Sequence, residues 1–450
     1  MALTVLNPAT EEPIAHLERA GVEKTDMAVA RAKAAFPAWR AVAPDDRARL
    51  LRRVATLVEE HAEELAQIES RNVGKPISGA RWEIGMVARV FHFYAGAVDK
   101  HYGETIPVPG GIAATFREPL GVVGLITPWN FPLNIASWKL GPALACGNTV
   151  VHKPAELTPL SALRLGELIL EAGIPEGVVS VLVGKGSVVG QRLIEHPDVA
   201  KIGFTGSTEV GQTVMRGAAG TIKRVTLELG GKSANVVFAD ADLERAAASA
   251  PYAVFDNAGQ DCCARSRIFV EKTAYDRFVE LLIEATRGVK VGDPADEATE
   301  MGPLISAAHR ETVASFVEGT PLFRGETPAG PGFWFPCTLV EAGNDDRVAR
   351  EEVFGPVAAL IPFEDEADAI RLANDTPFGL SGSIWTRDGA RALRVARAIE
   401  AGVLSVNSNS SVRVSTPFGG FKQSGFGREL GMHALEGYSE TKSVFISTEG

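Results

Sequence analysis

A regular alternation of short apolar strands with helical segments begins after Pro119 and constrains the fold more than any other feature of the sequence. The predicted strands are GVVGLIT, NTVVHK, VVSVLVG, KIGFTG and RVTLEL, with helical stretches such as 160–172 between them. Strands this apolar are typically buried on both faces, and the helices between them return the chain for parallel pairing. A second alternation follows Gly231, with strands SANVVFA, SRIFVEK and VAALIPF around a helical segment at 274–287. The pattern predicts an α/β fold with two parallel sheets.

The segments before Pro119 have different periodicities. From Asp26 to Arg71 apolar residues recur at helical spacing in a charged background, which indicates amphipathic helices of a scaffold. From Gly103 to Glu118 the chain has few helix formers and is rich in Pro, Gly and β-branched residues. That segment is expected to be extended, as in a projecting arm.

Composition excludes several classes of function. The chain has 450 residues, enough for two or three domains, and a net charge of −11 with both signs mixed along it. This charge disfavours nucleic acid or an anionic membrane as a partner. The four cysteines form no CxxC pair, so neither a disulfide framework nor a zinc site is expected. The N-terminus lacks the features of a signal peptide and no apolar run is long enough to span a membrane, so a cytoplasmic location is expected.

Polar or glycine-containing segments follow several of the predicted strands. They are PWNFP at 128–132, KPAE at 153–156 and FTGS at 204–207, and a further glycine-rich segment lies at 184–190. Open parallel sheets bind ligands at the carboxyl ends of their strands, where the N–H groups of helix N-termini suit a diphosphate. The segment at 184–190 lacks the full GxGxxG spacing. Each of these turns, taken alone, is equally compatible with an ordinary α/β loop.

Seven motifs in one order carry a family resemblance. They are PWNFPL (128–133), KPAE (153–156), FTGST (204–208), ELGGK (228–232), GQDC (259–262), EVFGPV (352–357) and FGGFK (418–422). In these motifs the chain resembles the hydrolytic, NAD(P)-dependent type of the aldehyde dehydrogenase superfamily. The resemblance implies two Rossmann-like parallel-sheet domains and a small β oligomerisation arm. The expected ranges are 1–100 and 120–229 for the NAD-binding domain, 230–423 for the catalytic domain, and 101–119 and 434–450 for the arm.

The resemblance implies three catalytic residues. Cys262 corresponds to the nucleophile, because it stands two places after Gln260, whereas a cysteine without this motif is more often a buried apolar residue. Glu228 corresponds to the base that activates the hydrolytic water, with an exposed salt-bridging glutamate as the alternative. Asn130 corresponds to an oxyanion donor together with the backbone N–H of Cys262, with a turn-forming asparagine as the alternative. Family members that transfer the acyl group to coenzyme A tend to lack the glutamate.

The same resemblance implies NAD as the cofactor. The cofactor-binding residues are expected to be Thr127, Trp129, Lys153, Glu156, Gly186, Gly190, Gly206, Ser207, Leu229, Glu352 and Phe354. The Glu156 carboxylate would accept hydrogen bonds from ribose hydroxyls and repel a 2′-phosphate, which favours NAD over NADP. Lys153 would partly offset that repulsion, so weaker use of NADP stays open.

The expected substrate pocket combines apolar walls with charges of both signs. The apolar residues are Phe131, Trp138 and Phe418. Asp256 and Asp261 favour a cationic chain such as an aminoaldehyde, with an internal hydrogen-bond network as the alternative for either carboxylate. Arg413 favours a carboxylate such as that of a semialdehyde. Broad oxidation of aliphatic or aromatic aldehydes is a further alternative.

Two other expectations concern partners and the class of function. The resemblance implies a homodimer or homotetramer that is assembled through the arm, and no metal site. A catalytically silent binding or structural protein is the alternative of another class, and the intact Cys262, Glu228 and Asn130 speak against it. The eight histidines show no Ser-His-Asp or Cys-His arrangement in sequence, which disfavours a cysteine hydrolase.

Overall fold

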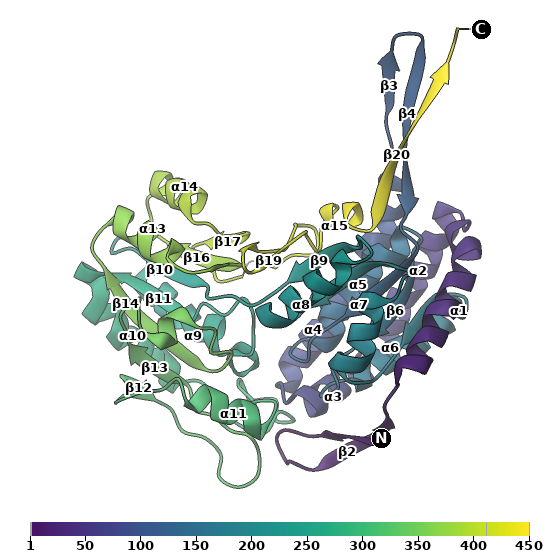
Figure 1. The fold of residues 1–450 in the computed structure, drawn as a ribbon. Coiled ribbons are helices and arrows are strands. Elements are labelled where there is room, and N and C mark those ends of the chain that lie inside the picture. Colours follow the sequence, from purple (N-terminus) through teal and green to yellow (C-terminus); the bar gives the residue numbers. More distant parts are fainter. Residues whose placement is uncertain (1, 411, 450) are drawn as a thin grey trace.

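The first sheet has the strand order β19-β9-β8-β5-β6-β7. The computed structural model describes residues 2–410 and 412–449 (Figure 1). The strands are β5 (Val122–Ile126), β6 (Thr149–Lys153), β7 (Val179–Val181), β8 (Val199–Thr205), β9 (Arg224–Glu228) and β19 (Gly425–Phe426). All pair in parallel except β19, which is antiparallel to β9. Every residue of β5 and β6 is buried, which explains the continuous apolar sequence of β5, whereas β6 also buries Thr149, His152 and Lys153.

Helices flank this sheet on both faces. They are α1 (Val22–Arg40), α2 (Pro44–Glu60), α3 (Ala62–Val73), α4 (Ile77–Ala97), α5 (Pro132–Ala145), α6 (Leu160–Glu171), α7 (Gln191–Glu195) and α8 (Thr208–Ala219). The amphipathic helices predicted between Asp26 and Arg71 correspond to α1, α2 and α3. The helices α4 and α5 were not anticipated, because every residue of α5 and more than half of α4 is buried, so neither shows a clear polar face.

The second sheet has the order β12-β13-β14-β11-β10-β16-β17. Its strands are β10 (Ala234–Val237), β11 (Arg267–Glu271), β12 (Phe323–Arg324), β13 (Thr338–Glu341), β14 (Val357–Phe363), β16 (Ser381–Trp385) and β17 (Val403–Val406). The associated helices are α9 (Leu243–Phe255), α10 (Tyr275–Arg287), α11 (Ala307–Ala314), α12 (Arg347–Arg350), α13 (Glu366–Asn374) and α14 (Gly389–Ala398). A separate apolar core fills this part of the molecule. The α/β fold with two parallel sheets is confirmed.

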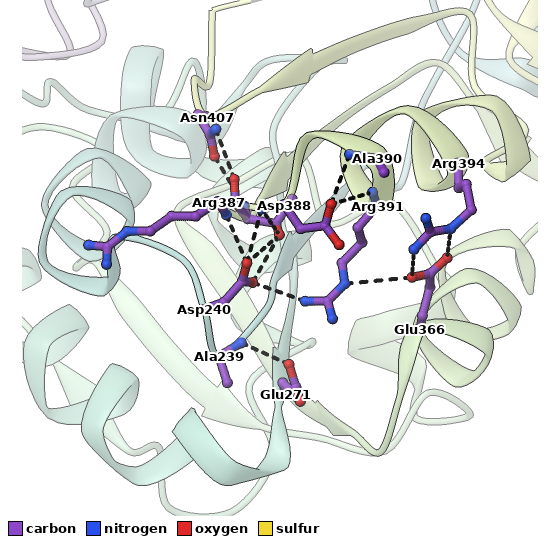
Figure 2. A network of polar contacts seen from close by, with 11 residues as sticks. Ala239, Asp240, Glu271, Glu366, Arg387, Asp388, Ala390, Arg391, Arg394 and Asn407 are labelled. Carbon is purple, nitrogen blue, oxygen red and sulfur yellow. Dashed lines mark hydrogen bonds and ion pairs between the residues drawn. The ribbon is translucent and has the colours of Figure 1, made fainter.

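The strand order of the second sheet reverses between β10 and β16, and polar side chains of the chain itself fill that point (Figure 2). The Asp240 carboxylate accepts hydrogen bonds from Thr386 Oγ1 at 2.9 Å and from Arg387 N at 3.0 Å. It also pairs with Arg391 at 3.0 Å. The carboxyl ends of a doubly wound sheet usually bind the ligand at such a reversal. Here these contacts tie two loops together instead, and the chemistry of this half of the molecule lies elsewhere.

A three-stranded antiparallel arm projects from the body (Figure 1). It consists of β3 (Thr105–Val108), β4 (Gly111–Pro119) and β20 (Ser439–Ser447), and β20 pairs with the whole length of β4. The extended segment predicted at 103–118 is therefore confirmed. The strands of the two large sheets and of the arm fall within the ranges expected for the three domains, except β19, which joins the first sheet from the segment 424–433 that no expected range includes. The domain boundaries stay a prediction.

The remaining elements are short. They are β1 (Ala2–Leu6), β2 (Pro13–Glu18), β15 (Phe378–Gly379), β18 (Phe421–Lys422), α15 (His433–Glu436), η1 (Val98–Lys100), η2 (Gly186–Gly190), η3 (Asp256–Gly259) and η4 (Lys272–Ala274). In the part of the chain that the structure describes, each helix is too short or too polar to cross a lipid bilayer.

Candidate active site

The loop that carries Cys262 precedes β11, so it lies at the amino end of a strand of the second sheet. The buried Gln260 holds this loop: its Nε2 donates to Asn257 O at 2.9 Å and its Oε1 accepts from Ile305 N at 2.8 Å. Gly259 has a φ of +70°, and a Cβ there would lie 2.2 Å from Gly355 O. The Gly-Gln part of the motif thus fixes the backbone that presents the thiol.

Glu228 ends β9, at the carboxyl edge of the first sheet. Its side chain is buried, and neither carboxylate oxygen has a hydrogen-bond partner among the described residues. Burial and the nearby Glu429 carboxylate raise the pKa of Glu228 well above its ordinary value. Such a carboxyl can take up a proton near neutral pH, as a general base must.

Two cavities meet at these residues. The smaller has a volume of about 230 Å³ and the larger about 400 Å³. Cys262, Glu228 and Thr205 line both of them. The two parallel-sheet halves therefore bring thiol and carboxylate to one junction with a cavity on either side.

Asn130 follows β5 and is tied to the cysteine loop. Its Nδ2 donates to Gln260 O at 2.9 Å, and its backbone oxygen accepts from Asn257 Nδ2 at 2.9 Å. It is buried and lines the smaller cavity together with Cys262. The amide group is thus held in place at the same cavity as the thiol, as an oxyanion donor requires.

The smaller cavity suits the nicotinamide end of a dinucleotide such as NAD. Six of the expected cofactor residues line it: Trp129, Gly206, Ser207, Leu229, Glu352 and Phe354. Gly206 and Ser207 lead into α8, and helix N-termini favour phosphate groups.

The carboxylate of Glu352 lies on the same cavity wall. Its Oε1 accepts a hydrogen bond from Gly231 N at 3.0 Å, and burial raises its pKa to about 7. A Cβ at residue 230 would lie 2.2 Å from Glu352 Oε2, so a larger residue there would displace the Glu352 side chain. A buried acceptor next to a helix N-terminus fits the ribose and phosphates of NAD.

The other five expected cofactor residues lie off this wall. Thr127 is buried with its Oγ1 2.9 Å from His152 Nε2, and a Cβ at Gly190 would contact Lys153 Cδ. Lys153 Nζ donates to Pro154 O at 2.7 Å, and burial lowers the pKa of the amine to about 8. The remaining two are Glu156, whose carboxylate pairs with Arg19 Nε at 2.6 Å, and the exposed Gly186. Their role toward a cofactor stays a prediction.

The larger cavity has the expected apolar walls and both expected acids. Phe131, Trp138, Phe418, Asp256 and Asp261 line it. Sequence reasoning missed several further lining residues, which come from segments far apart in the chain: Trp82, Met86, Ile135, Tyr252, Arg265 and Val412. Arg413 does not line this cavity but a neighbouring one farther out.

Comparison with known proteins identifies the family. The profile of the aldehyde dehydrogenase family matches residues 1–444. The betaine aldehyde dehydrogenase of Bacillus subtilis is 42% identical over 99% of this chain and 94% of its own. The chain belongs to the aldehyde dehydrogenase family. The resemblance found in the motifs is confirmed, and with it the class of enzyme, an oxidoreductase that acts on aldehydes.

Solved structures of this family have the same fold. The NAD⁺ complex of the aldehyde dehydrogenase from Bacillus cereus has a TM-score of 0.98 and 41% identity, covering 100% of this chain and 94% of that chain. PnpE from Pseudomonas sp. WBC-3 has a TM-score of 0.98 and 44% identity, covering 100% and 95%. These neighbours confirm the expected fold class.

The electrostatic environment of the dehydrogenase thiol opposes its ionisation. A contact with the Cys263 thiol, burial and the Asp261 carboxylate all raise the pKa of Cys262 well above its ordinary value. Asp261 Oδ1 accepts a hydrogen bond from Cys263 N at 2.9 Å, which fixes the carboxylate beside the two thiols. In the absence of substrate and cofactor, the thiol is therefore expected to stay protonated.

Asp261→Asn is expected to lower the pH at which the thiolate forms. Removal of the like charge favours the thiolate, so the midpoint of Cys262 alkylation should move down by about one pH unit. The amide oxygen of asparagine can still accept from Cys263 N, which preserves the loop. Iodoacetamide labelling as a function of pH, followed by peptide mass spectrometry, measures the midpoint. A midpoint that stays in place or moves upward would contradict this electrostatic account.

One group of described residues has the spacing of a metal site. The ligand atoms of Asp261, Cys262 and Cys263 lie within 4.8 Å of one another. Two of these residues are thiols on the nucleophile loop, so a thiophilic ion there would compete with the aldehyde. The metal-free enzyme expected from the sequence stays a prediction.

Proposed function

We propose that this dehydrogenase oxidises an aldehyde to a carboxylic acid with NAD, through a thioester on Cys262. The observation that carries the proposal is the junction of two cavities, whose shared wall holds Cys262 and Glu228. A covalent mechanism with hydride transfer needs an aldehyde on one side of the thiol and a cofactor on the other. A solved neighbour at 41% identity binds NAD⁺, which supports NAD as the cofactor.

The chain's own residues divide the reaction into two halves. In the first, the Cys262 thiol gives its proton to water, its Sγ adds to the aldehyde carbon, and the amide of Asn130 stabilises the oxyanion of the thiohemiacetal. NAD, when bound, accepts the hydride that leaves this carbon. In the second half, Glu228 takes a proton from water, which attacks the thioester and releases the acid and the thiol.

The substrate proposed for the larger cavity is an aminoaldehyde. Asp256 and Asp261 line that cavity, and the carboxylate of each accepts one backbone N–H, from Asn257 and Cys263 respectively, at 2.9 Å. Burial raises the pKa of both acids, and a cationic amine of the substrate would favour their ionised form. The 42% identity to a betaine aldehyde dehydrogenase also supports this class. Semialdehydes and uncharged aldehydes are the alternatives.

Cofactor choice is proposed to favour NAD, with weaker use of NADP. Glu156 supplies the carboxylate that would repel a 2′-phosphate. The ion pair with Arg19, both side chains being about one-quarter exposed, weakens that repulsion. Arg19 was not singled out from the sequence, because it lies 137 residues before Glu156.

A panel of aldehydes tests the proposed function. Uncharged, aromatic, amino and semialdehyde substrates are compared at matched concentrations with NAD and with NADP, and NADH or NADPH absorbance is recorded. We expect the highest kcat/KM for an aminoaldehyde with NAD. If no member of the panel gives reduced cofactor, the chain is a binding or structural protein and the proposal fails.

We also propose that the enzyme is a cytoplasmic homodimer or homotetramer that is assembled through the arm. The arm exposes apolar side chains on its strands: Ile106, Ile112, Phe116, Val444, Phe445 and Ile446. Its outer strands β3 and β20 each leave one edge unpaired within the described chain. Exposed apolar strands with a free edge readily pair with another chain.

Phe445→Asp is expected to break this assembly. A buried, unpaired carboxylate in an interface costs several kcal/mol, so the variant should run as a monomer of 47.7 kDa. Ile222→Asp is the matched control, because Ile222 is 91% exposed on the body of the molecule. Light scattering measures the mass of each. A wild-type protein that is already monomeric would refute the assembly.

A further inference from the structure

A third cavity adjoins the larger of the two cavities at Cys262, which we call the inner cavity and which is proposed to bind the aldehyde. It has a volume of about 610 Å³, and it shares Trp82, Met86, Ser410 and Val412 with the inner cavity. Its other lining residues include Arg89, His92, Phe93 and Arg413. We call this outer cavity the vestibule. The shared residues make the two cavities one path from the surface to Cys262.

Helix α4 provides one wall of the whole path. Trp82, Met86, Arg89 and Phe93 follow one another at spacings of four, three and four residues, so they lie on one face of the helix. An α-helix rises 1.5 Å per residue, which places Arg89 about 10 Å along the axis from Trp82. Trp82 and Met86, which the two cavities share, therefore precede Arg89 and Phe93, which line only the vestibule, along this face of the helix.

The charges at the two ends of the path have opposite signs. Asp256 and Asp261 line the inner cavity, whereas Arg89 and Arg413 line the vestibule. Some surface arginines of this protein pair with a carboxylate, as Arg49 does with Asp46 at 2.8 Å.

The two vestibule arginines differ in this respect. Arg89 Nη1 lies 3.6 Å from Met86 Sδ, and Arg413 Nη1 donates to Ser410 O at 3.3 Å and to Ser410 Oγ at 3.4 Å. Among the described residues, no carboxylate lies within ion-pair distance of either guanidinium. The third basic residue, His92, already pairs with Glu59 at 3.1 Å. The vestibule thus presents two guanidinium groups that no described carboxylate neutralises.

We infer that the vestibule is a second substrate subsite, which binds a carboxylate at the far end of the aldehyde. Guanidinium groups recognise carboxylates through short, charge-assisted hydrogen bonds. The substrate class is then an aldehyde with an amino group near the reacting carbon and a carboxylate at the far end of its chain. This inference rests on the proposed function, because it extends the same substrate path.

Four aldehydes of matched chain length test the subsite. One is uncharged, one carries an amino group, one carries a terminal carboxylate and one carries both. Each is measured with the wild type, Arg413→Gln and Arg89→Gln. Arg49→Gln is the control, since Arg49 is exposed on α2, pairs with Asp46 and lines none of these cavities.

The expected result is selective for the carboxylate. For the two carboxylate substrates, each vestibule variant should lower kcat/KM by about tenfold or more, mainly through KM. The uncharged and amino substrates should change by less than about twofold, as should every substrate with the Arg49 control. Equal losses for all four aldehydes, or no loss for the carboxylate pair, would overturn the subsite.

A binding measurement tests the subsite independently of catalytic activity. Calorimetry with an unreactive straight-chain ω-amino acid, which pairs an amine for the inner acids with a carboxylate for the vestibule, should show binding to the wild type that each vestibule substitution weakens by about tenfold. Unchanged affinity in both variants would overturn the inference. An enzyme that reduces NAD with none of the four aldehydes, yet loses ω-amino acid affinity in the variants, would refute the proposed function and leave the anion subsite standing.

Discussion

Cys262→Ala is expected to abolish NADH production, whereas Cys263→Ala keeps most of it. Cys262 lines both cavities, and without its Sγ no thiohemiacetal can form. Cys263 is buried, and it lines only the larger of the two cavities. Since the Cys263 thiol raises the pKa of its neighbour, its removal should also ease formation of the Cys262 thiolate. Steady-state NADH absorbance measures the activity of both variants.

Binding and stability measurements separate loss of chemistry from loss of fold. Calorimetry should show that Cys262→Ala still binds NAD, and thermal unfolding should give a Tm close to that of the wild type. An equal loss of activity in Cys262→Ala and Cys263→Ala would show that the nucleophile is assigned wrongly.

Glu228→Gln is expected to separate the two half-reactions. Hydride transfer needs the thiol, the oxyanion donor and NAD, while hydrolysis also needs a base for water. The variant should therefore release about one equivalent of NADH per active site and then turn over about 10² to 10⁴ times more slowly. Because no described residue hydrogen-bonds to the buried Glu228 carboxylate, the isosteric amide should fit with little structural change. Stopped-flow absorbance resolves the burst from the slow phase.

Mass spectrometry gives an independent test of the same variant. The quenched enzyme should carry the acyl group on the peptide that contains Cys262. An unmodified peptide together with a missing burst would mean that Glu228 acts before hydride transfer, by removing the proton of the thiol. That result would contradict the role proposed for Glu228 in hydrolysis.

The positions of several site residues could be predicted because the first sheet follows a general rule. Asn130 follows β5, Thr205 ends β8 and Glu228 ends β9, all at the carboxyl edge, where parallel strands bring their following loops together. The motifs ELGGK and GQDC also predict the pairing of Glu228 with Cys262 from sequence alone. Their roles still rest on the resemblance and on the experiments above.

The same rule fails for the second sheet. Cys262 precedes β11 and lies at an amino end, while the reversal point between β10 and β16 is filled by Asp240 and its partners. The strand pattern could not show this, because the placement depends on how Gln260 and Gly259 pack against residues near 305 and 355. Long-range contacts of single loops leave no periodic signal in a sequence.

The sequence by itself determined the α/β class, the two sheets, the extended arm and the catalytic motifs. Burial on both strand faces and helical amphipathicity are local, and they are written into the order of the residues. Tertiary structure alone decided that Arg413 lies outside the aldehyde cavity, that Arg89 joins it there, and that Arg19 pairs with Glu156. These side chains lie more than a hundred residues apart in the sequence and come together only in the folded protein. The sign of the charge around a substrate depends on such long-range contacts rather than on composition.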